Sequence, residues 1–304
     1  MNISNELIKL KAENILGETV ISVIPFTNIT NNYVYKINTN HKKYILKIYK
    51  SGWPEDGKLT FVNRKLNECK IPCAKIVYYN HDDGDLQSGL LIEEFLTGSI
   101  ADKVNLTVEQ ETELFKKLAV FARRLHSIKF LKYGYIGNGE PFEDTYSEYV
   151  YDAFDDNTES LRTNSLFSGD ELSEIKEKLY ISLKLCDKLP PVLCHGDLSK
   201  KNIMIQDNGE IVLIDYDDVT AIPWICDVAR LTLWMKLNYN IEKALYLRNV
   251  FMENYPTQEK EIFYTSENAL HVWECLGYMN FFAGTEMFET VKKMFVEAWD
   301  NLIK

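Results

Sequence analysis

Alternating apolar and polar positions dominate the first third of the chain. Five segments are rich in β-branched and aromatic residues, and several of them repeat with a period of two, which is typical of strands that bury one face. These segments are 19–26, 33–39, 41–49, 76–79 and 90–95. The turn-like sequence at 81–85 separates the last two. The pattern predicts a five-stranded, antiparallel sheet.

Helical spacing accompanies this sheet and then replaces it. A short helix is predicted at 4–16, and another at 58–69 places Leu59, Val62 and Leu66 on one face. After Gly98 the chain is mainly helical. It is interrupted by a hairpin signal at 203–214. We therefore predict an α+β protein with two lobes, an N-terminal sheet lobe at 1–96 and a larger, mainly helical lobe at 97–304.

Composition and charge narrow the class of protein. The 304 residues carry a formal net charge of −11, which argues against nucleic acid or an anionic membrane as the main partner. The acidity is uneven: residues 1–96 hold 12 Lys/Arg against 11 Asp/Glu, and residues 97–304 hold 22 against 34. The six cysteines form no CxxC pair, and neither a secretory signal nor a membrane-length apolar run is visible. We expect a cytoplasmic protein with free thiols.

The segment 193–218 carries the clearest chemistry. It holds His195 and Asp197 two residues apart, then Asn202, a hairpin, and Asp215. Carboxylate and amide oxygens suit Mg²⁺, which binds few protein ligands together with substrate phosphates. The alternative is an ordinary loop and hairpin with scattered acidic residues.

This segment resembles the catalytic loop of the aminoglycoside phosphotransferase / choline kinase-like family, through HGDLxxxN followed by IDYDD. The resemblance implies a protein-kinase-like fold and transfer of the γ-phosphoryl group of ATP or GTP to a small-molecule hydroxyl. It implies that Asp197 orients the hydroxyl and accepts its proton, and that Asn202 and Asp215 bind Mg²⁺. His195 and Asp227, the latter in the segment Pro223-Trp-Ile-Cys-Asp227, would support the loop.

The resemblance also implies nucleotide contacts in the sheet lobe. Lys47 would neutralise phosphate charge, although a lysine exposed at a sheet edge is the alternative. The remaining positions implied are Thr30 and Asn31 in a glycine-free turn, Ile92, Glu93 and Phe95 in a hinge strand, and Met204 and Ile214 beneath the base. A helix glutamate that pairs with the strand lysine in such kinases cannot be assigned in this sequence.

The acidic second lobe suggests a cationic acceptor. Candidate carboxylates are Asp218, Glu267 and Glu274, the last two among aromatic residues. An aminoglycoside-like antibiotic is favoured, with choline, ethanolamine or another small metabolite as the alternative. A catalytically weak nucleotide-binding module with a kinase-like fold is the hypothesis from another class.

Overall fold

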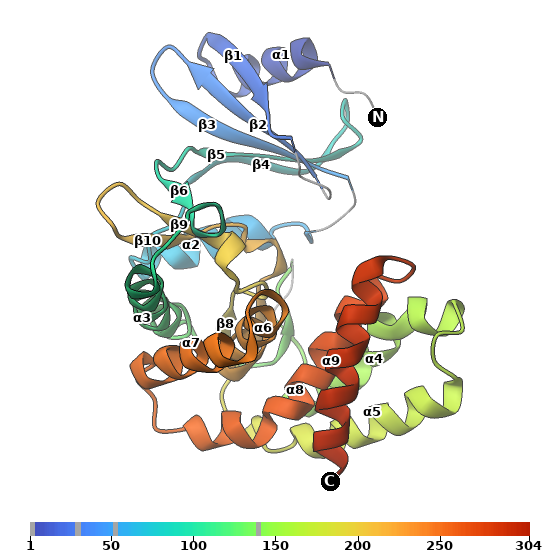
Figure 1. Ribbon diagram of the computed structural model, residues 1–304. Coiled ribbons are helices and arrows are strands. Elements are labelled where there is room, and N and C mark those ends of the chain that lie inside the picture. The colour runs from blue at the N-terminus through green and yellow to red at the C-terminus, as the bar shows by residue number, and fades with distance from the viewer. Residues whose placement is uncertain (1–3, 28–31, 51–53, 138–140) are drawn as a thin grey trace. The chain divides into compact units, whose positions relative to one another are not determined.

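The computed structural model describes residues 4–27, 32–50, 54–137 and 141–304, and it separates into two compact units (Figure 1). The first unit contains residues 1–103, 137–139 and 203–217, and the second contains 104–136, 140–202 and 218–304. The segment 203–217, which the sequence analysis placed in the second lobe, therefore belongs to the first unit.

A five-stranded antiparallel sheet forms most of the first unit, as predicted (Figure 1). Its strands are β1 (Val20–Pro25), β2 (Asn32–Thr39), β3 (Lys43–Tyr49), β4 (Ile76–Asp83) and β5 (Ser88–Glu94). They are ordered β1-β2-β3-β5-β4, so β3 and β5 are direct neighbours. Lys47 lies opposite Leu91 in this pair, and Ile45 lies opposite Glu93.

The two faces of the sheet are covered by different helices. One face packs Leu46, Ile48 and Ile92 against Ile8 of α1 (Asn5–Leu16). On the other face, Tyr49 and Leu91 pack against Leu59 of α2 (Lys58–Glu68). Because successive side chains of a strand point to opposite faces, Lys47 shares the α2 face with Tyr49 and Leu91.

A second, three-stranded sheet completes the first unit. It contains β6 (Ser99–Ile100), β9 (Ile203–Ile205) and β10 (Ile211–Leu213), in the order β10-β9-β6. Gly98 precedes β6 with φ +140°, and a Cβ at this position would lie 2.3 Å from the carbonyl oxygen of Ile205. Only glycine fits so close an approach. It lets β6 pair with β9 of the hairpin that β9 and β10 form.

The second unit is mainly helical (Figure 1). Its helices are α3 (Val108–Leu125), α4 (Tyr146–Thr163), α5 (Gly169–Leu183), α6 (Trp224–Asn238), α7 (Ile241–Asn254), α8 (Lys260–Phe281) and α9 (Glu286–Ile303). A small sheet joins them, with β7 (Gly134–Tyr135), β11 (Thr220–Ile222) and β8 (Val192–Cys194) in that order. Thr107 and Gln110 form a capping box at the start of α3, with both reciprocal hydrogen bonds present. None of the helices in the described ranges combines the length and apolarity needed to span a membrane.

Candidate active site

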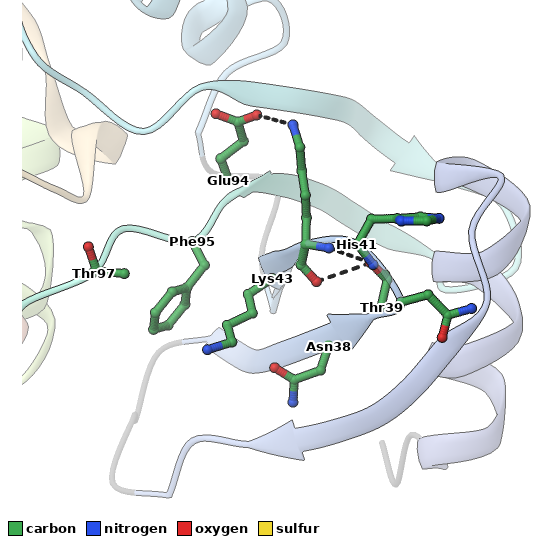
Figure 2. Close-up of a pocket in the computed structure, with 9 residues that line it drawn as sticks. Asn38, Thr39, His41, Lys43, Glu94, Phe95 and Thr97 are labelled. Carbon is green, nitrogen blue, oxygen red and sulfur yellow. Dashed lines mark hydrogen bonds and ion pairs between the residues drawn. The ribbon is translucent and has the colours of Figure 1, made fainter.

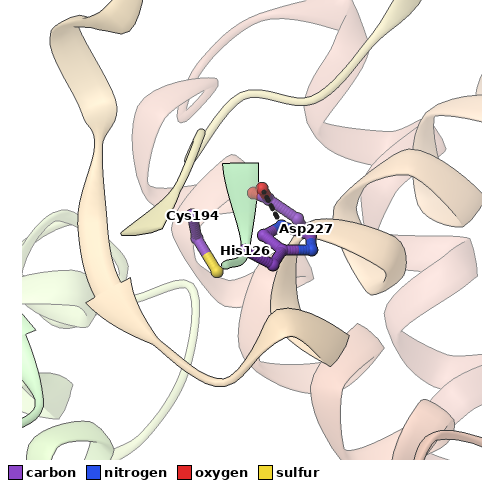
Figure 3. Close-up of side chains that lie close together, drawn as sticks. All are labelled: His126, Cys194 and Asp227. Carbon is purple, nitrogen blue, oxygen red and sulfur yellow. Dashed lines mark hydrogen bonds and ion pairs between the residues drawn. The ribbon is translucent and has the colours of Figure 1, made fainter. Parts of the chain in front are cut away.

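One buried carboxylate holds the loop that follows β8. Asp227 lies in the first turn of α6 and accepts hydrogen bonds from the backbone N–H of His195 at 2.7 Å and of Gly196 at 2.9 Å. Its Oδ2 also lies 3.0 Å from Nε2 of His126 (Figure 3). Burial alone would raise the pKa of Asp227, but the hydrogen bonds from His126 and His195 hold it below its usual value. The charged carboxylate thus fixes the first residues of the loop.

His126 links Asp227 to Tyr255, the residue that follows α7. Its Nδ1 lies 2.8 Å from the hydroxyl of Tyr255, so one ring nitrogen faces a hydroxyl and the other a carboxylate. Because Asp227 accepts at Nε2, that nitrogen carries the proton. His126 therefore positions the carboxylate of Asp227.

Cys194 lies beside this pair, and its Sγ completes a cluster of three potential metal ligands within 4.8 Å (Figure 3). However, the thiol donates to the carbonyl oxygens of Ile222 and Pro223, both at 3.4 Å. Burial raises the pKa of Cys194 well above its usual value, which keeps the thiol protonated. We therefore interpret the cluster as structural.

Both backbone polar groups of Gly196, its N–H and its carbonyl, are hydrogen-bonded. It has φ +78°, and a Cβ would lie 1.9 Å from the carbonyl oxygen of Asp218. Its own carbonyl accepts a short hydrogen bond from Arg230 of α6. Nε of Arg230 in turn bonds to Glu274 of α8 at 2.7 Å, and the ring of Tyr278 lies 5.6 Å from the guanidinium carbon. The residue before Asp197 is thus fixed by an N–H, a carbonyl and a steric contact.

Asp197 and Asn202 are joined directly. Nδ2 of Asn202 donates to the backbone carbonyl of Asp197 at 2.9 Å and to its carboxylate at 2.8 Å. Both donors of the amide are therefore used within the loop, and within the described chain its oxygen accepts no hydrogen bond. An amide oxygen left over beside a carboxylate suits a hard divalent cation.

The far end of the loop is tied to α3 and α7. Lys200 donates to the buried carboxylate of Glu111 at 2.7 Å, and Lys243 lies 2.5 Å from the same carboxylate. Sequence reasoning missed this cluster because the three residues are far apart in the chain.

The first unit carries a second constellation around Lys47. Only 11% of the Lys47 side chain is exposed. Its Nζ bonds to Asp215 at 2.6 Å and makes a shorter bond to Asp217. The other oxygen of Asp217 accepts from the hydroxyl of Tyr49 at 3.0 Å. Burial alone would lower the pKa of Lys47, but the two carboxylates raise it above its usual value. Lys47 therefore stays charged and is not a lysine exposed at a sheet edge.

Asp215 and Glu93 complete this constellation. Asp215 follows β10 with φ +65°, a left-handed conformation that is costly for most residues but tolerated by aspartate. Glu93 is half-buried on the same sheet face as Lys47, and burial raises its pKa to about 7. Three carboxylates thus surround one lysine.

The structure places the hinge residue Ile92 differently from the expectation. Ile92 was expected beside the base, but it is fully buried in the core against α1, on the opposite face from Lys47. The N–H of Phe95 already donates to the carbonyl of Lys43 at 3.1 Å, so a base contact there would break a hydrogen bond of the sheet. Because strands alternate with a period of two, an error of one residue exchanges the faces.

Phe95 also borders an open pocket beside the turn between β2 and β3 (Figure 2). Thr39, His41 and Glu94 line it as well, and Lys42 pairs with Glu94 at 3.1 Å. The ring of Phe95 lies under Lys36, with 4.5 Å between Nζ and the ring centroid. We assign no chemistry to this pocket.

Of the other four residues predicted to contact the nucleotide, the structure describes two. Met204 on β9 and Ile214 after β10 are partly buried and belong to the same unit as Lys47. Thr30 and Asn31 lie outside the described residues.

Two of the three candidate carboxylates for the acceptor have arginine partners. Glu267 bonds to Nε of Arg248 at 2.9 Å and also to its Nη2, and Glu274 is paired with Arg230. Neither is the unpaired countercharge that a cationic acceptor would need. Asp218 is exposed and lies near the charge of Arg230.

Comparison with known proteins places these residues in a family. The sequence profile of the phosphotransferase enzyme family matches residues 22–248. The chain belongs to this family. No match was found among curated protein sequences.

Solved structures of this fold include kinases with different acceptors. An aminoglycoside phosphotransferase, in a ternary complex with ADP and hygromycin B, has a TM-score of 0.67 at 14% identity, covering 96% of this chain and 97% of that one. Choline kinase LicA from Streptococcus pneumoniae has a TM-score of 0.65 at 16% identity, covering 98% of both chains. A Plasmodium vivax ethanolamine kinase has a TM-score of 0.67 at 15% identity, covering 94% of this chain and 83% of that one. At these identities the likeness shows the fold, which is the protein-kinase-like fold expected from the sequence.

Proposed function

We propose that this phosphotransferase moves the γ-phosphoryl group of ATP or GTP to a hydroxyl of a small molecule. The observation that carries the proposal is the fixed geometry of the loop at Asp197. Asp227 and Arg230 hold the neighbouring residue Gly196. Asn202 holds the carboxylate of Asp197. Phosphoryl transfer depends mainly on positioning and electrostatics, so a carboxylate fixed in this way suits the residue that orients the acceptor hydroxyl.

In this proposal Asp197 accepts the proton of the hydroxyl and Lys47 binds phosphate oxygens. Lys47 suits this role because it is charged and kept in place by neighbouring carboxylates. Glu93 would border the base through its backbone carbonyl, with Met204 and Ile214 beneath it. The N–H of Phe95 would join this contact only by giving up its hydrogen bond to Lys43. Thr30 and Asn31 remain proposed phosphate contacts.

Asn202 and Asp215 are the proposed ligands of Mg²⁺. The unused amide oxygen of Asn202 and the exposed carboxylate of Asp215 are both oxygen donors of the kind this ion prefers. These two residues would hold the ion, whose positive charge would offset that of the phosphate groups.

We propose an amine-bearing acceptor, with an aminoglycoside as the first compound to test. The excess of acidic residues in 97–304 supports a cation, and hygromycin B is bound by one protein of this fold. Choline and ethanolamine are the alternatives, as the names of other proteins of this fold suggest. Asp218 is the carboxylate proposed to contact the amine, because its side chain is exposed.

The test is a panel of aminoglycosides, choline, ethanolamine and sugars, each incubated with the protein, MgCl₂ and either ATP or GTP. Release of the nucleoside diphosphate above the rate without acceptor identifies the acceptor and the preferred nucleotide. Nucleotide binding without turnover on any hydroxylated amine would contradict the proposal and favour a nucleotide-binding module.

A further inference from the structure

We propose that Asp217, fixed by Tyr49, is the residue that positions Lys47, in place of the helix glutamate that protein kinases use. The inference rests on the proposed function, in which Lys47 binds the phosphates of the nucleotide. In protein kinases the strand lysine is held by a glutamate of the neighbouring helix. Here the helix that packs on the same sheet face is α2.

Helix α2 offers no carboxylate to Lys47. Its single acidic residue, Glu68, is the last residue of the helix and pairs with Arg64 at 3.6 Å and Lys65 at 3.3 Å. The residue that α2 directs at the strand pair is Leu59, which is 4% exposed and packs with Tyr49 and Leu91. On the sheet face that Lys47 shares, α2 therefore presents an apolar residue and no carboxylate.

Asp217, in the segment that follows β10, supplies the carboxylate instead. It is 9% exposed, bonds to Nζ of Lys47 through one oxygen, and accepts from the hydroxyl of Tyr49 at 3.0 Å through the other. Tyr49 is itself fixed, because it is 2% exposed and packs against Leu59. Nζ of Lys47 also lies 5.0 Å from the ring centroid of Tyr49. The apolar helix residue thus supports the tyrosine, the tyrosine orients the aspartate, and the aspartate holds the lysine.

This arrangement separates two tasks between neighbouring carboxylates. Lys47 bonds to both Asp215 and Asp217, but Asp215 is 47% exposed and Asp217 is not. With Lys47 held by the buried Asp217, the exposed Asp215 can turn to a divalent cation while the lysine keeps its place. Without Asp217, Lys47 would retain Asp215 alone and compete with the cation for it.

The test measures binding of AMP-PNP by calorimetry over a range of MgCl₂ concentrations. We expect Asp217→Asn to weaken binding about tenfold or more and to raise the MgCl₂ concentration needed for half-maximal binding, as for loss of a hydrogen bond to a charged group. Tyr49→Phe should shift both quantities in the same direction by less, and should add little in the Asp217→Asn background. A merely structural role would lower the melting temperature without changing the MgCl₂ requirement.

Asp83→Asn is the matched control. It removes a buried carboxylate that bonds to Nζ of another lysine of the same unit, Lys11, at 2.6 Å, and neither residue belongs to the proposed nucleotide site. We expect less than about a threefold change in the affinity for AMP-PNP. Equal effects of Asp83→Asn and Asp217→Asn would overturn the inference, because the loss of any buried carboxylate of this unit would then matter. Unchanged binding by Asp217→Asn or by Tyr49→Phe would also overturn it.

Lys47→Ala separates this inference from the proposed function. If Lys47→Ala loses affinity for AMP-PNP and Asp217→Asn does not, only the role of Asp217 fails. If Lys47→Ala binds AMP-PNP as the wild type does, the proposed role of the lysine fails first. Leu59→Glu in the Asp217→Asn background places a carboxylate on the helix, and we expect it to recover part of the lost affinity.

Discussion

Replacing Asp227 with asparagine tests how the loop that carries Asp197 is held. The carboxylate accepts hydrogen bonds from two backbone N–H groups, at 2.7 and 2.9 Å, and lies 3.0 Å from His126. Asparagine keeps one oxygen but presents an NH₂ group to donors on the other side. Each hydrogen bond to a charged group contributes about 1.5–3 kcal/mol. Since the bonds share one side chain they do not add fully, and we expect a loss of about 3–5 kcal/mol in the free energy of unfolding.

Urea denaturation followed by tryptophan fluorescence measures this loss. Trp224 is a suitable probe because its ring stacks on Tyr255 with 4.6 Å between centroids, and Tyr255 bonds to His126. Asp207→Asn, an exposed aspartate in the hairpin turn, should change the free energy by less than about 0.5 kcal/mol. A loss below about 1 kcal/mol for Asp227→Asn would refute the view that this carboxylate anchors the loop.

The pH dependence gives a second signature of the same residue. The folded pKa of Asp227 is lowered, so the unfolded chain binds the proton more readily. The stability that Asp227 contributes is therefore fully present above its unfolded pKa, about 3.9, and is lost as the pH falls toward its folded pKa. Asp227→Asn should consequently lose less stability than the wild type between neutral and acidic pH. Parallel acid titrations of the two proteins would contradict this reasoning.

Three further changes have defined expectations. Gly196→Ala should abolish phosphate transfer, because Gly196 has φ +78° and an added Cβ would lie 1.9 Å from the carbonyl oxygen of Asp218. Gly169→Ala should keep wild-type activity in the same assay, because its Cβ would meet no atom within 4 Å. Thr107→Ala removes the hydroxyl that caps α3 and should lower the free energy of unfolding by about 1 kcal/mol in urea; no change would contradict the capping role. Glu267→Gln breaks the pair with Arg248 and should lower stability by about 1.5–3 kcal/mol. Because that carboxylate is already paired, the KM for the acceptor should not change, and a raised KM would restore Glu267 to the acceptor site.

The sheet could be predicted because its signal is local. The strands of 33–39 and 41–49 alternate with a period of two and are joined by a short turn, and both appear at nearly these bounds. The register of the hinge strand could not be fixed in the same way. The base contact of Ile92 was implied by its position in the resemblance, and the run of apolar residues before Glu93 does not show which face Ile92 occupies. The structure places it in the core with Ile8.

The candidate catalytic residues could be named from the sequence, but their hydrogen-bond partners could not. The spacing of Asp197, Asn202 and Asp215 is short enough to be recognised in sequence. In contrast, the bond between Lys47 and Asp217 joins residues 170 positions apart. It exists only because the hairpin at 203–217 belongs to the first unit, which no local pattern reveals.

The pairing of Glu267 and Arg248 is invisible in the sequence for a similar reason. The two residues lie on different helices, α8 and α7, and meet only once those helices have packed. Counting acidic residues predicted an open anionic surface, but packing supplied two of the candidate carboxylates with arginines. A net charge therefore indicates the class of ligand less reliably than the contacts of individual carboxylates.

The most direct test of the account is phosphate transfer by Asp197→Asn. With the acceptor identified by the panel, mass spectrometry would follow the gain of one phosphoryl group by the acceptor at saturating MgATP or MgGTP. We expect the wild type to form this product in proportion to the nucleoside diphosphate released. Asp197→Asn should bind the nucleotide with unchanged affinity and form the product at least about 100-fold more slowly. Product formation at the wild-type rate by Asp197→Asn would contradict the assignment of Asp197 as the residue that activates the acceptor hydroxyl.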